Sequence, residues 1–369
     1  MTKQLHRQQI MEIKPYVPGK PVEEVERELG ISDIIKLASN ENPLGPAPAA
    51  LKVMQEMINK VAAYPDGNCY YLKNALAEKL GLSFSHLIVG NGSDEVIKLI
   101  AEAFLDEGDE MIMANPSFSE YDFAAKIMGA RTVAVPTKKY THDLDAMAAA
   151  VTDKTKLVFV CNPNNPTGTM VGIEDVKAFL DKLPQGVITV FDEAYFEYVV
   201  DADYPDTLEF VREERDVVVL RTFSKIYGLA GLRIGYGIAK PELIGLISRV
   251  KEPFNVNMLA QGAALAALGD EEHVKNSVAM NEQGKKYLYT EFERMNLPYV
   301  PTHANFIWVQ IKADCQKAFA KLMRLGVIVR TGDIFGAPDV IRVTVGTTEQ
   351  NKRFIEALEK VLTEEGVFS

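Results

Sequence analysis

Short apolar runs alternate with amphipathic stretches between about residues 85 and 239. The amphipathic stretches, among them Val96–Leu105, Val176–Leu183 and Leu208–Glu214, have the spacing of helices with one apolar face. Continuous apolar strands that alternate with such helices are typical of a mostly parallel sheet covered on both faces. We therefore expect an α/β fold. The seven expected strands are His86–Val89, Met111–Ala114, Thr132–Val135, Leu157–Cys161, Ile188–Phe191, Val217–Leu220 and Gly235–Ala239.

The pattern changes after Pro253, where a long helical region is expected over Asn257–Met295. Strands and helices then follow at shorter intervals, which predicts a smaller α+β domain over residues 254–369. The large domain should cover 44–253, and the arm 1–43 contains four prolines, so it cannot form one long helix. The later elements expected in the small domain are strands Phe306–Ile311, Val327–Arg330 and Ile341–Val345 and helices Cys315–Leu325 and Glu349–Glu364.

Composition narrows the class of protein. The 369 residues are 47% hydrophobic, which is enough for a large core, and the net charge of −11 comes from interspersed acids and bases. This charge distribution lacks the concentrated basic face that nucleic-acid binding needs. No apolar run approaches the ~18 residues of a membrane helix, and the first residues lack a signal peptide, so a cytoplasmic location is expected. Three distant cysteines and five scattered histidines predict neither a disulfide nor a metal site.

Lys225 follows the expected strand Val217–Leu220, and glycines come soon after it. A lysine here can form a Schiff base with a carbonyl cofactor if its amine is neutral near pH 7, a state favoured by burial and by nearby positive charge. Arg233, further along the same loop, could hold a phosphate through two parallel hydrogen bonds. Taken alone, the segment is better explained as a surface lysine in a glycine-rich loop.

Asp192 and Tyr195 come at the end of the strand that finishes at Phe191. A carboxylate at the end of an apolar strand is costly unless it has a cationic or protonated partner, and a pyridinium N–H is such a partner. A carboxylate that keeps the pyridine nitrogen protonated makes the pyridine ring an electron sink, while Tyr195 could bind the phenolic oxygen of that ring. An aspartate that caps a helix is the plain alternative. The chain has no GxxxxGK[ST] motif, which disfavours an NTPase.

Two loops between strands and helices add polar groups. In Asn162–Gly168 two prolines and a glycine fix a rigid turn that could present the Asn165 amide to a ring oxygen. Gly90–Glu95 offers backbone N–H groups at a helix start and the Ser93 hydroxyl, which together make an anion cradle. It lacks the third glycine of a dinucleotide-binding fingerprint. Ordinary first-turn acids would explain the acidic residues of this segment equally well.

Two further residues are weaker candidates. Phe118 follows the strand Met111–Ala114 and could stack on a planar ring, although on its own it would count as core, as would Tyr121. Arg342 alternates with apolar residues in a short strand, and a buried arginine needs an anion. A substrate carboxylate or a plain salt bridge would serve as that anion.

All the segments of the large domain come where a strand ends, which is where ligands bind in such sheets. In this combination the chain resembles the fold-type I pyridoxal-phosphate aminotransferases, and more closely the histidinol-phosphate aminotransferases. The resemblance runs nearly end to end, from Lys14–Tyr16 and Ala38–Pro43 to Ile341–Thr347. It implies a mixed sheet, pyridoxal 5'-phosphate as cofactor, and a homodimer in which the arm packs on the small domain and on the partner subunit.

The resemblance also implies a role for each site residue. Lys225 would form the Schiff base and carry the proton in catalysis, and Asp192 would pair with the pyridine nitrogen. Asn165 and Tyr195 would bind the ring oxygen, and Phe118 would stack on the ring. Tyr64 would reach the cofactor phosphate from the neighbouring subunit. The other implied cofactor-binding residues are Gly92, Ser93, Asp94, Ser224 and Arg233.

The implied substrate-binding residues are Tyr16, Asn40, Arg330 and Arg342. Arg342 would bind an α-carboxylate, whereas Arg330 and Tyr16 would meet a substrate phosphate. This implies a ping-pong step of histidine biosynthesis that converts histidinol phosphate and 2-oxoglutarate to imidazole-acetol phosphate and glutamate. Phe118 stands where some members carry tyrosine. An aromatic or dual specificity, for phenylalanine and tyrosine, is the alternative within the family.

Other functions are possible on the same fold. A decarboxylase or a C–S lyase would share the lysine and the aspartate, but an arginine that binds the carboxylate disfavours decarboxylation. A transcriptional regulator with an aminotransferase domain would need a DNA-binding module, and we expect none in the short arm.

Overall fold

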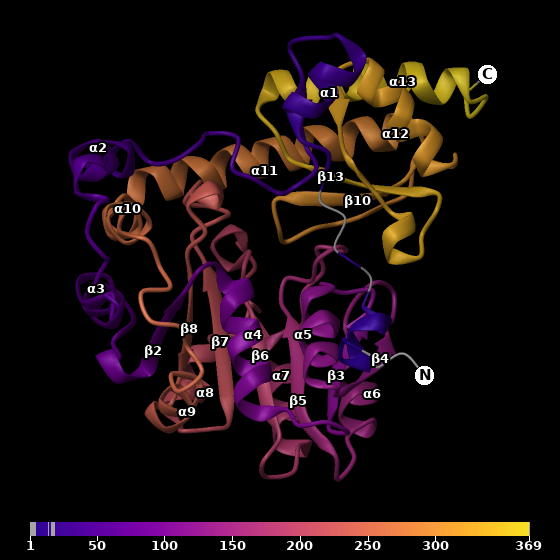
Figure 1. The fold of residues 1–369 in the computed structure, drawn as a ribbon. Coiled ribbons are helices and arrows are strands. Elements are labelled where there is room, and N and C mark those ends of the chain that lie inside the picture. The colour runs from indigo at the N-terminus through magenta and orange to yellow at the C-terminus, as the bar shows by residue number, and fades with distance from the viewer. Residues whose placement is uncertain (1–4, 14, 16–18, 369) are drawn as a thin grey trace.

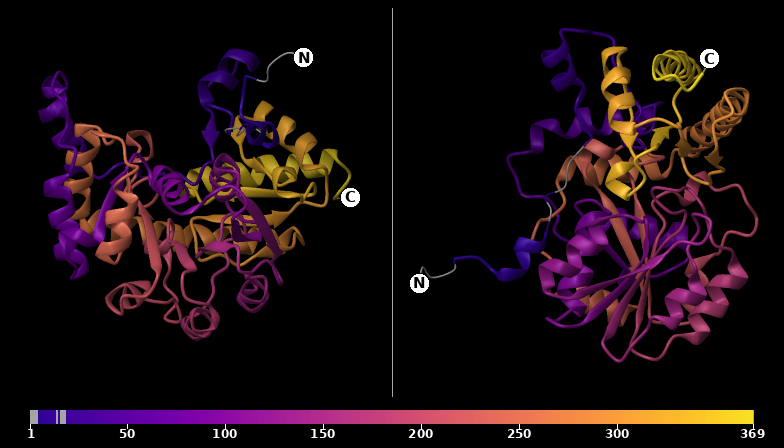
Figure 2. Two further views of the ribbon diagram at one scale, coloured as in Figure 1. Left: turned by 60° about the horizontal axis from the view of Figure 1, so that its bottom comes forward. Right: turned by 90° about the vertical axis from the view of Figure 1, so that its right-hand side faces the viewer.

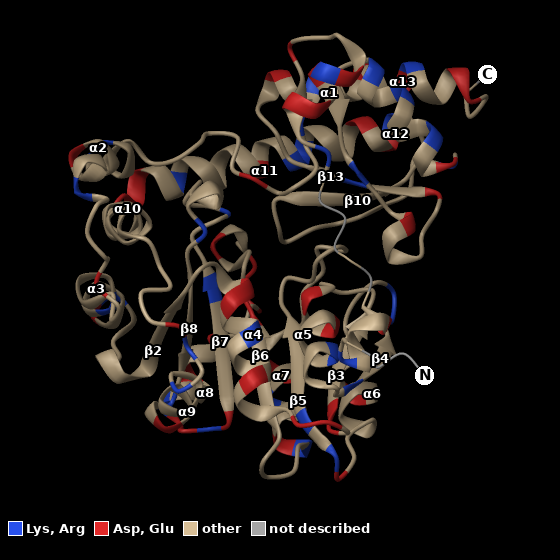
Figure 3. Cartoon of the chain, in the orientation of Figure 1, with Lys and Arg blue, Asp and Glu red and all other residues tan. Residues whose placement is uncertain are grey.

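The computed structural model describes residues 5–13, 15 and 19–368. A large sheet with helices on both faces forms one part of the molecule, and a smaller group of helices and strands lies beyond one end of its strands (Figure 1). Acidic and basic residues are interspersed over both parts (Figure 3). In the part of the chain that the structure describes, no helix has the length and apolar character needed to cross a membrane.

The large sheet has the strand order β2-β8-β7-β6-β5-β3-β4. Within this sheet β8 runs antiparallel to its neighbours and the other pairs are parallel. The expected α/β fold with a mostly parallel, mixed sheet of seven strands is therefore confirmed. Its strands are β2 (Leu87–Gly90), β3 (Glu110–Asn115), β4 (Arg131–Pro136), β5 (Thr155–Cys161), β6 (Ile188–Asp192), β7 (Val217–Thr222) and β8 (Gly235–Ala239).

Helices cover both faces of this sheet (Figure 2), and an apolar core lies on each face. Successive residues of a strand face opposite sides, so Val217 and Val219 of β7 pack into one core, and Val218 and Leu220 pack into the other. The helices on the second face are α4 (Ser93–Phe104), α5 (Glu120–Met128) and α9 (Pro241–Ile247). Those on the first face are α2 (Pro48–Met57), α3 (Tyr70–Leu80), α6 (Leu144–Ala149), α7 (Ile173–Lys182), α8 (Thr207–Arg212) and α10 (Met258–Leu268).

The expected long helical region over Asn257–Met295 consists of two helices. The first, α10, ends at Leu268, and α11 begins at Glu271 and runs to Arg294. Asp270 caps α11, since its side chain accepts a hydrogen bond from the backbone N–H of His273 at 3.0 Å. The packing differs as well: α10 belongs to the core of the large sheet, whereas α11 extends from there to the smaller part (Figure 1).

The smaller part contains an antiparallel sheet with the order β12-β13-β10-β9. The expected strand Val327–Arg330 is split into β11 and β12, because the first pairs with β1 (Ile35–Lys36) of the arm and the second with β13. The elements of this part are β9 (Tyr299–Val300), β10 (Phe306–Gln310), α12 (Cys315–Arg324), β11 (Val327–Ile328), β12 (Arg330–Thr331), β13 (Val340–Thr344) and α13 (Thr348–Glu364).

The N-terminal arm contacts both parts of the molecule. A short 3₁₀ helix, Gln8–Glu12, lies against α5, and its Gln9 donates a hydrogen bond at 3.3 Å to Glu107, which lies between α4 and β3. Helix α1 (Val22–Leu29) and strand β1 (Ile35–Lys36) instead pack on the smaller part. The division of the chain at residues 43 and 253 remains a prediction.

Candidate active site

A cavity of about 390 Å³ lies where the parallel strands of the large sheet end. Its wall combines residues from the ends of β2, β3, β5, β6 and β7 with residues from the arm and from the smaller part. The expected site residues that line it are Asn40, Ser93, Asp94, Phe118, Asn165, Asp192, Tyr195, Ser224, Lys225, Arg233, Arg330 and Arg342. The structure thus brings most of the expected site together at the carboxyl ends of the strands.

Two expected residues of the described part of the chain are not in this wall. The Tyr64 side chain is 82% exposed, and its ring stacks on Phe254 at a centroid distance of 4.8 Å. Gly92 lies just behind the wall as the cap of α4. Tyr16 lies outside the described residues.

Lys225 lies three residues beyond the end of β7. Its ammonium donates a hydrogen bond to the carbonyl oxygen of Ser39 at 3.2 Å. Burial of the ammonium, reinforced by the nearby Arg342 guanidinium, lowers the Lys225 pKa to about 8. A far larger share of this amine is therefore neutral near pH 7 than for an ordinary lysine, which is the state that attacks a carbonyl group.

Asp192 ends β6 and its carboxylate is buried. Oδ2 accepts a hydrogen bond from the Tyr121 hydroxyl at 2.6 Å, and Oδ1 accepts one from the backbone N–H of Ala194 at 3.1 Å. Burial nevertheless raises the Asp192 pKa to about 6, because these two neutral donors compensate only part of the lost hydration. A carboxylate in this state is suited to a protonated ring nitrogen.

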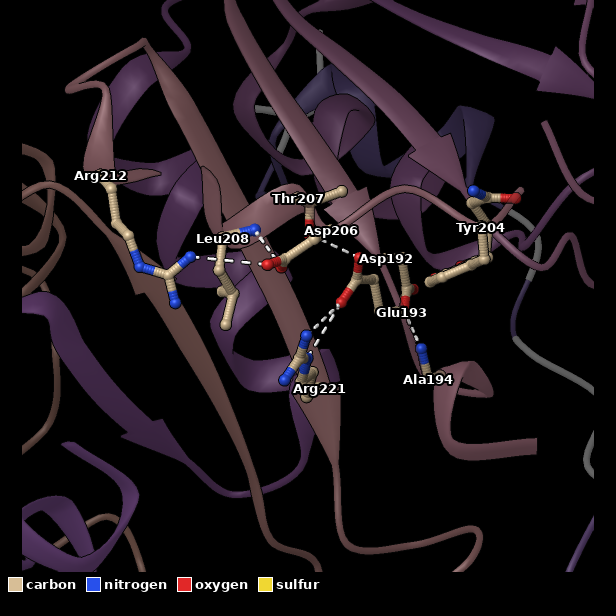
Figure 4. Close-up of polar contacts among 10 residues, drawn as sticks. Asp192, Glu193, Ala194, Tyr204, Asp206, Thr207, Leu208, Arg212 and Arg221 are labelled. Carbon is tan, nitrogen blue, oxygen red and sulfur yellow. Dashed lines mark hydrogen bonds and ion pairs between the residues drawn. The ribbon is translucent and has the colours of Figure 1, made fainter. Parts of the chain in front are cut away.

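The neighbouring Glu193 faces a separate set of partners (Figure 4). Its carboxylate is bonded by Arg221 of β7, with Nε and Nη2 both 2.9 Å from Oε2, and by the Thr207 hydroxyl at 2.6 Å. All three side chains are buried. This ion pair ties the end of β6 to β7, and so it fixes the backbone from which Asp192 enters the cavity.

The end of the cavity near β2 is suited to an anion. Helix α4 begins at Ser93, three residues earlier than expected, and the first backbone N–H groups of a helix have no partner within it. Arg233 reaches this point and bonds Asp94 Oδ2 through Nη2 at 2.7 Å. Gly92 leaves room for that guanidinium, since a Cβ there would lie 2.7 Å from Arg233 Nη2. An anion bound here would therefore meet both a helix start and an arginine.

Asn40 connects the arm to the opposite end of the cavity. Its side-chain N–H group donates to the Tyr195 hydroxyl at 2.9 Å, and its backbone N–H donates to the Thr344 hydroxyl at 2.9 Å. Arg342 donates to Asn165 Oδ1 at 2.5 Å and to the carbonyl oxygen of Ala38 at 2.7 Å. These bonds orient the Asn165 amide and the Tyr195 hydroxyl, the two groups that are expected to bind the oxygen of the cofactor ring.

Sequence reasoning missed several groups in or beside the cavity. Tyr121 was assigned to the core, and its ring does stack on Phe159 at 4.4 Å, but its hydroxyl also bonds Asp192. Glu41 and Cys161 also line the wall, the latter as a buried free thiol. No sequence signal separates Tyr121 from an ordinary core tyrosine. Tyr121 lies in α5, which follows β3, whereas its partner Asp192 ends β6, and β5 lies between these two strands in the sheet.

The chain matches known aminotransferases along most of its length. A profile of the family "Aminotransferase class I and II" matches residues 32–358. The histidinol-phosphate aminotransferase of Moorella thermoacetica is 58% identical over 96% of this chain and 92% of its own length. Histidinol-phosphate aminotransferase 2 of Carboxydothermus hydrogenoformans is 50% identical over 96% of this chain and 99% of its own length.

A solved structure resembles the whole chain. The crystal structure of histidinol-phosphate aminotransferase from Sinorhizobium meliloti, in complex with pyridoxal-5'-phosphate, superposes with a TM-score of 0.91 at 26% identity and covers 99% of both chains. The chain therefore belongs to the class I and II aminotransferases. Within that class it belongs with the histidinol-phosphate aminotransferases, which confirms the resemblance read from its motifs.

Proposed function

We propose that this chain catalyses the transfer of an amino group between histidinol phosphate and 2-oxoglutarate, with pyridoxal 5'-phosphate as cofactor. The observation that carries the proposal is the pair Arg330 and Arg342, which face one cavity together with the amine of Lys225. The names of the relatives at 58% and 50% identity support the same substrate. The reaction belongs to histidine biosynthesis.

The residues of the cavity fit the cofactor. The buried Asp192 carboxylate, whose present donors are neutral, would pair with the ring nitrogen. The helix start at Ser93, with Asp94, Ser224 and Arg233, would hold the phosphate. Bound pyridoxal phosphate supplies an aldehyde for amine exchange and an electron-withdrawing ring.

The ring itself would lie between two sets of side chains. Phe118, whose ring packs edge-on against Tyr121 at 5.6 Å, would stack on one face of it. Asn165 and Tyr195 would bind the ring oxygen, since Arg342 and Asn40 already hold these two side chains in place. These roles remain predictions about individual residues.

Lys225 would act in two ways. Its amine, with a pKa lowered to about 8, would join the cofactor covalently and later move a proton at the substrate α-carbon. The Tyr195 ring, whose centroid lies 5.6 Å from Nζ, limits the space in which that amine can move. The Lys225 amine would thus stay close to the cofactor both when it joins the cofactor and when it moves the proton.

The two arginines would sort the substrates by their anions. Arg342 would bind the α-carboxylate of glutamate, a group that histidinol phosphate lacks. Arg330, half-buried in the same wall, would bind the phosphate of histidinol phosphate. Tyr16 would join Arg330 there, which is the role that the resemblance implies for it.

The experiment that tests this function compares catalytic efficiency with histidinol phosphate, phenylalanine and tyrosine under one set of conditions. We expect histidinol phosphate to be preferred by at least about tenfold, because a charge-assisted contact to Arg330 contributes that much. Equal efficiencies would instead support the aromatic or dual specificity. A cytoplasmic location and a homodimer that shares Tyr64 between sites also remain part of this proposal.

A further inference from the structure

A buried histidine outside the cavity wall contacts the loop that carries Asn165. The His142 side chain is only 6% exposed, and its Nε2 lies 3.1 Å from Oδ1 of Asn164. His142 lies between β4 and α6, and no function of the site described above involves it. Its imidazole is therefore a buried polar group whose purpose the packing of an apolar core does not explain.

Asn164 connects two loops of the site. Its Nδ2 donates to the carbonyl oxygen of Pro116 at 3.2 Å and to the Thr167 hydroxyl at 2.8 Å, while Oδ1 accepts from the Ser117 hydroxyl at 2.9 Å. Since Oδ1 is the acceptor, His142 must donate through Nε2–H. Within the described residues, His142 Nδ1 has no hydrogen-bond partner.

The imidazole keeps this donor over a wide pH range. Burial lowers the His142 pKa to about 4, so the ring is neutral under the conditions in which an aminotransferase works. The group that faces its Nε2 is the uncharged amide of Asn164. The contact is thus a fixed neutral hydrogen bond.

The turn that presents His142 is strained. Lys139 and Tyr140 have φ angles of 50° and 67°, in the left-handed region that residues other than glycine seldom adopt. Lys138 and Thr141 close the turn with backbone bonds of 2.8 and 3.1 Å. Strain of this kind persists where the surrounding structure holds it, often next to a functional site.

The same turn is attached to the Asn165 loop at a second point. The Thr169 hydroxyl donates to the carbonyl oxygen of Tyr140 at 2.8 Å, and the backbone N–H of Asn164 donates to the carbonyl oxygen of Thr169 at 2.8 Å. Two hydrogen bonds therefore attach the strained turn and the adjacent His142 to this loop: the bond from Thr169 to Tyr140, and the bond from the His142 side chain to Asn164.

We propose that His142 is a positioning residue, which acts through Asn164 to fix Phe118 and Asn165 against the cofactor ring. Ser117 precedes Phe118 and Asn164 precedes Asn165, so the Asn164 amide connects the two loops that carry these residues. This inference rests on the proposed function, in which Phe118 and Asn165 contact that ring. Without the imidazole N–H, Asn164 Oδ1 keeps a single donor and the two loops lose part of their connection.

The test compares three variants of the full chain. His142→Phe removes the donor, His142→Gln keeps an N–H donor of similar reach, and His273→Phe removes an imidazole of α11 whose buried Nε2 also has no partner in the described chain. Two quantities are measured: the dissociation constant for pyridoxal phosphate, and the pH midpoint of the absorbance change of the bound cofactor.

We expect His142→Phe to weaken pyridoxal-phosphate binding about tenfold and to shift the pH midpoint, because one buried hydrogen bond is lost. His142→Gln should stay within about threefold of the wild type, since an amide N–H can replace the imidazole donor. His273→Phe should change neither quantity. Unchanged values in His142→Phe, or a His142→Gln variant as defective as it, would overturn the proposal.

A further variant covers the case in which His142→Phe does not fold. Ser117→Ala removes the other donor to the same oxygen, so it should shift the pH midpoint in the same direction, and no shift would overturn the proposal. The wild type shows whether a failure concerns the proposed function or only the positioning role of His142. If it fails to take up pyridoxal phosphate, the proposed function is wrong; if it does so and His142→Phe equals it, the positioning role alone is wrong.

Discussion

Arg330 of β12 lies directly opposite Arg342 of β13 on neighbouring antiparallel strands, and both side chains line the cavity. Like charges placed opposite each other in a sheet are unfavourable. Such a pair is explained if the site binds two anionic groups in turn. The α-carboxylate of glutamate in one half-reaction and the phosphate of histidinol phosphate in the other would meet that requirement.

The pair leads to a prediction about substrate preference. We expect Arg330→Ala to lower catalytic efficiency with histidinol phosphate by about 10- to 100-fold, because a charge-assisted hydrogen bond is lost, and to affect phenylalanine much less. Arg342→Ala should instead impair glutamate. Arg324→Ala, on the exposed face of α12, is the matched control and should behave as the wild type. Steady-state kinetics decide the matter, and equal losses for both substrates in Arg330→Ala would count against its assigned role.

A second prediction concerns the covalent bond to the cofactor. Lys225→Ala should abolish borohydride-stable labelling by pyridoxal phosphate and nearly all turnover, because Lys225 supplies the attacking amine. Lys275→Ala removes an exposed lysine of α11 and should leave both intact. Peptide mapping after reduction identifies the labelled residue. A label on another lysine, or full activity of the Lys225→Ala variant, would refute the mechanism.

The lowered pKa of that amine predicts a pH dependence. Only the neutral amine attacks an aldehyde, so the rate of covalent attachment to cofactor-free protein should rise with pH and level off above the Lys225 pKa of about 8. Removing the neighbouring cation in Arg342→Ala should move this midpoint upward, since Arg342 helps to lower the pKa. Stopped-flow absorbance across pH 6–10 measures it. A midpoint near the ordinary lysine value in the wild type would contradict the structure.

Much of the fold could be predicted because the signals are local. Continuous apolar runs identify buried strands, and parallel strands bring their carboxyl ends to one edge, so residues as distant as Phe118 and Lys225 could be placed in one site. The split between β11 and β12 was missed, because no glycine or proline interrupts Val327–Arg330 and its pairing with the arm and with β13 is not local.

The contributions of Tyr121 and His142 depend on similar non-local packing. Each lies outside the recognisable motifs, and each acts through a side chain from another loop or strand, Asp192 for the first and Asn164 for the second. Neither residue differs in its sequence context from a tyrosine or histidine of an ordinary core. Only the three-dimensional structure reveals such contacts, because hydrogen bonds between distant segments leave no periodic signal in one sequence.

A further prediction concerns the stability of the cofactor-free protein. Burial raises the Asp192 pKa from 3.8 to about 6, so the folded state holds this proton more tightly than the unfolded state. The stability of folding should therefore fall as pH rises from about 4 to about 6, by up to about 3 kcal/mol, and remain lower above pH 6. Asp192→Asn should remove this contribution and stabilise the cofactor-free protein near pH 8.

Denaturant unfolding of both proteins between pH 4 and pH 8 gives the difference directly, because other titrating groups are common to the pair. The same variant should bind pyridoxal phosphate more weakly, since a neutral amide cannot form an ion pair with a protonated ring nitrogen. Gains in stability together with loss of affinity would identify Asp192 as a group kept for function. A wild type that is stabilised relative to Asp192→Asn at pH 8 would contradict the burial argument.

The last prediction tests whether active sites are shared between subunits. Tyr64 is exposed on the surface of its own chain and stacks on Phe254, away from the cavity wall, so it is available to a neighbouring subunit. Tyr64→Ala and Lys225→Ala should each be impaired alone. In a mixed dimer, the site that keeps Lys225 would receive an intact Tyr64 from the other protomer. Denaturing and refolding an equal mixture should then restore about a quarter of wild-type activity, because half of the dimers are mixed and each has one complete site. If Tyr64 served its own subunit, no complete site would form and the mixture would stay as inactive as its components.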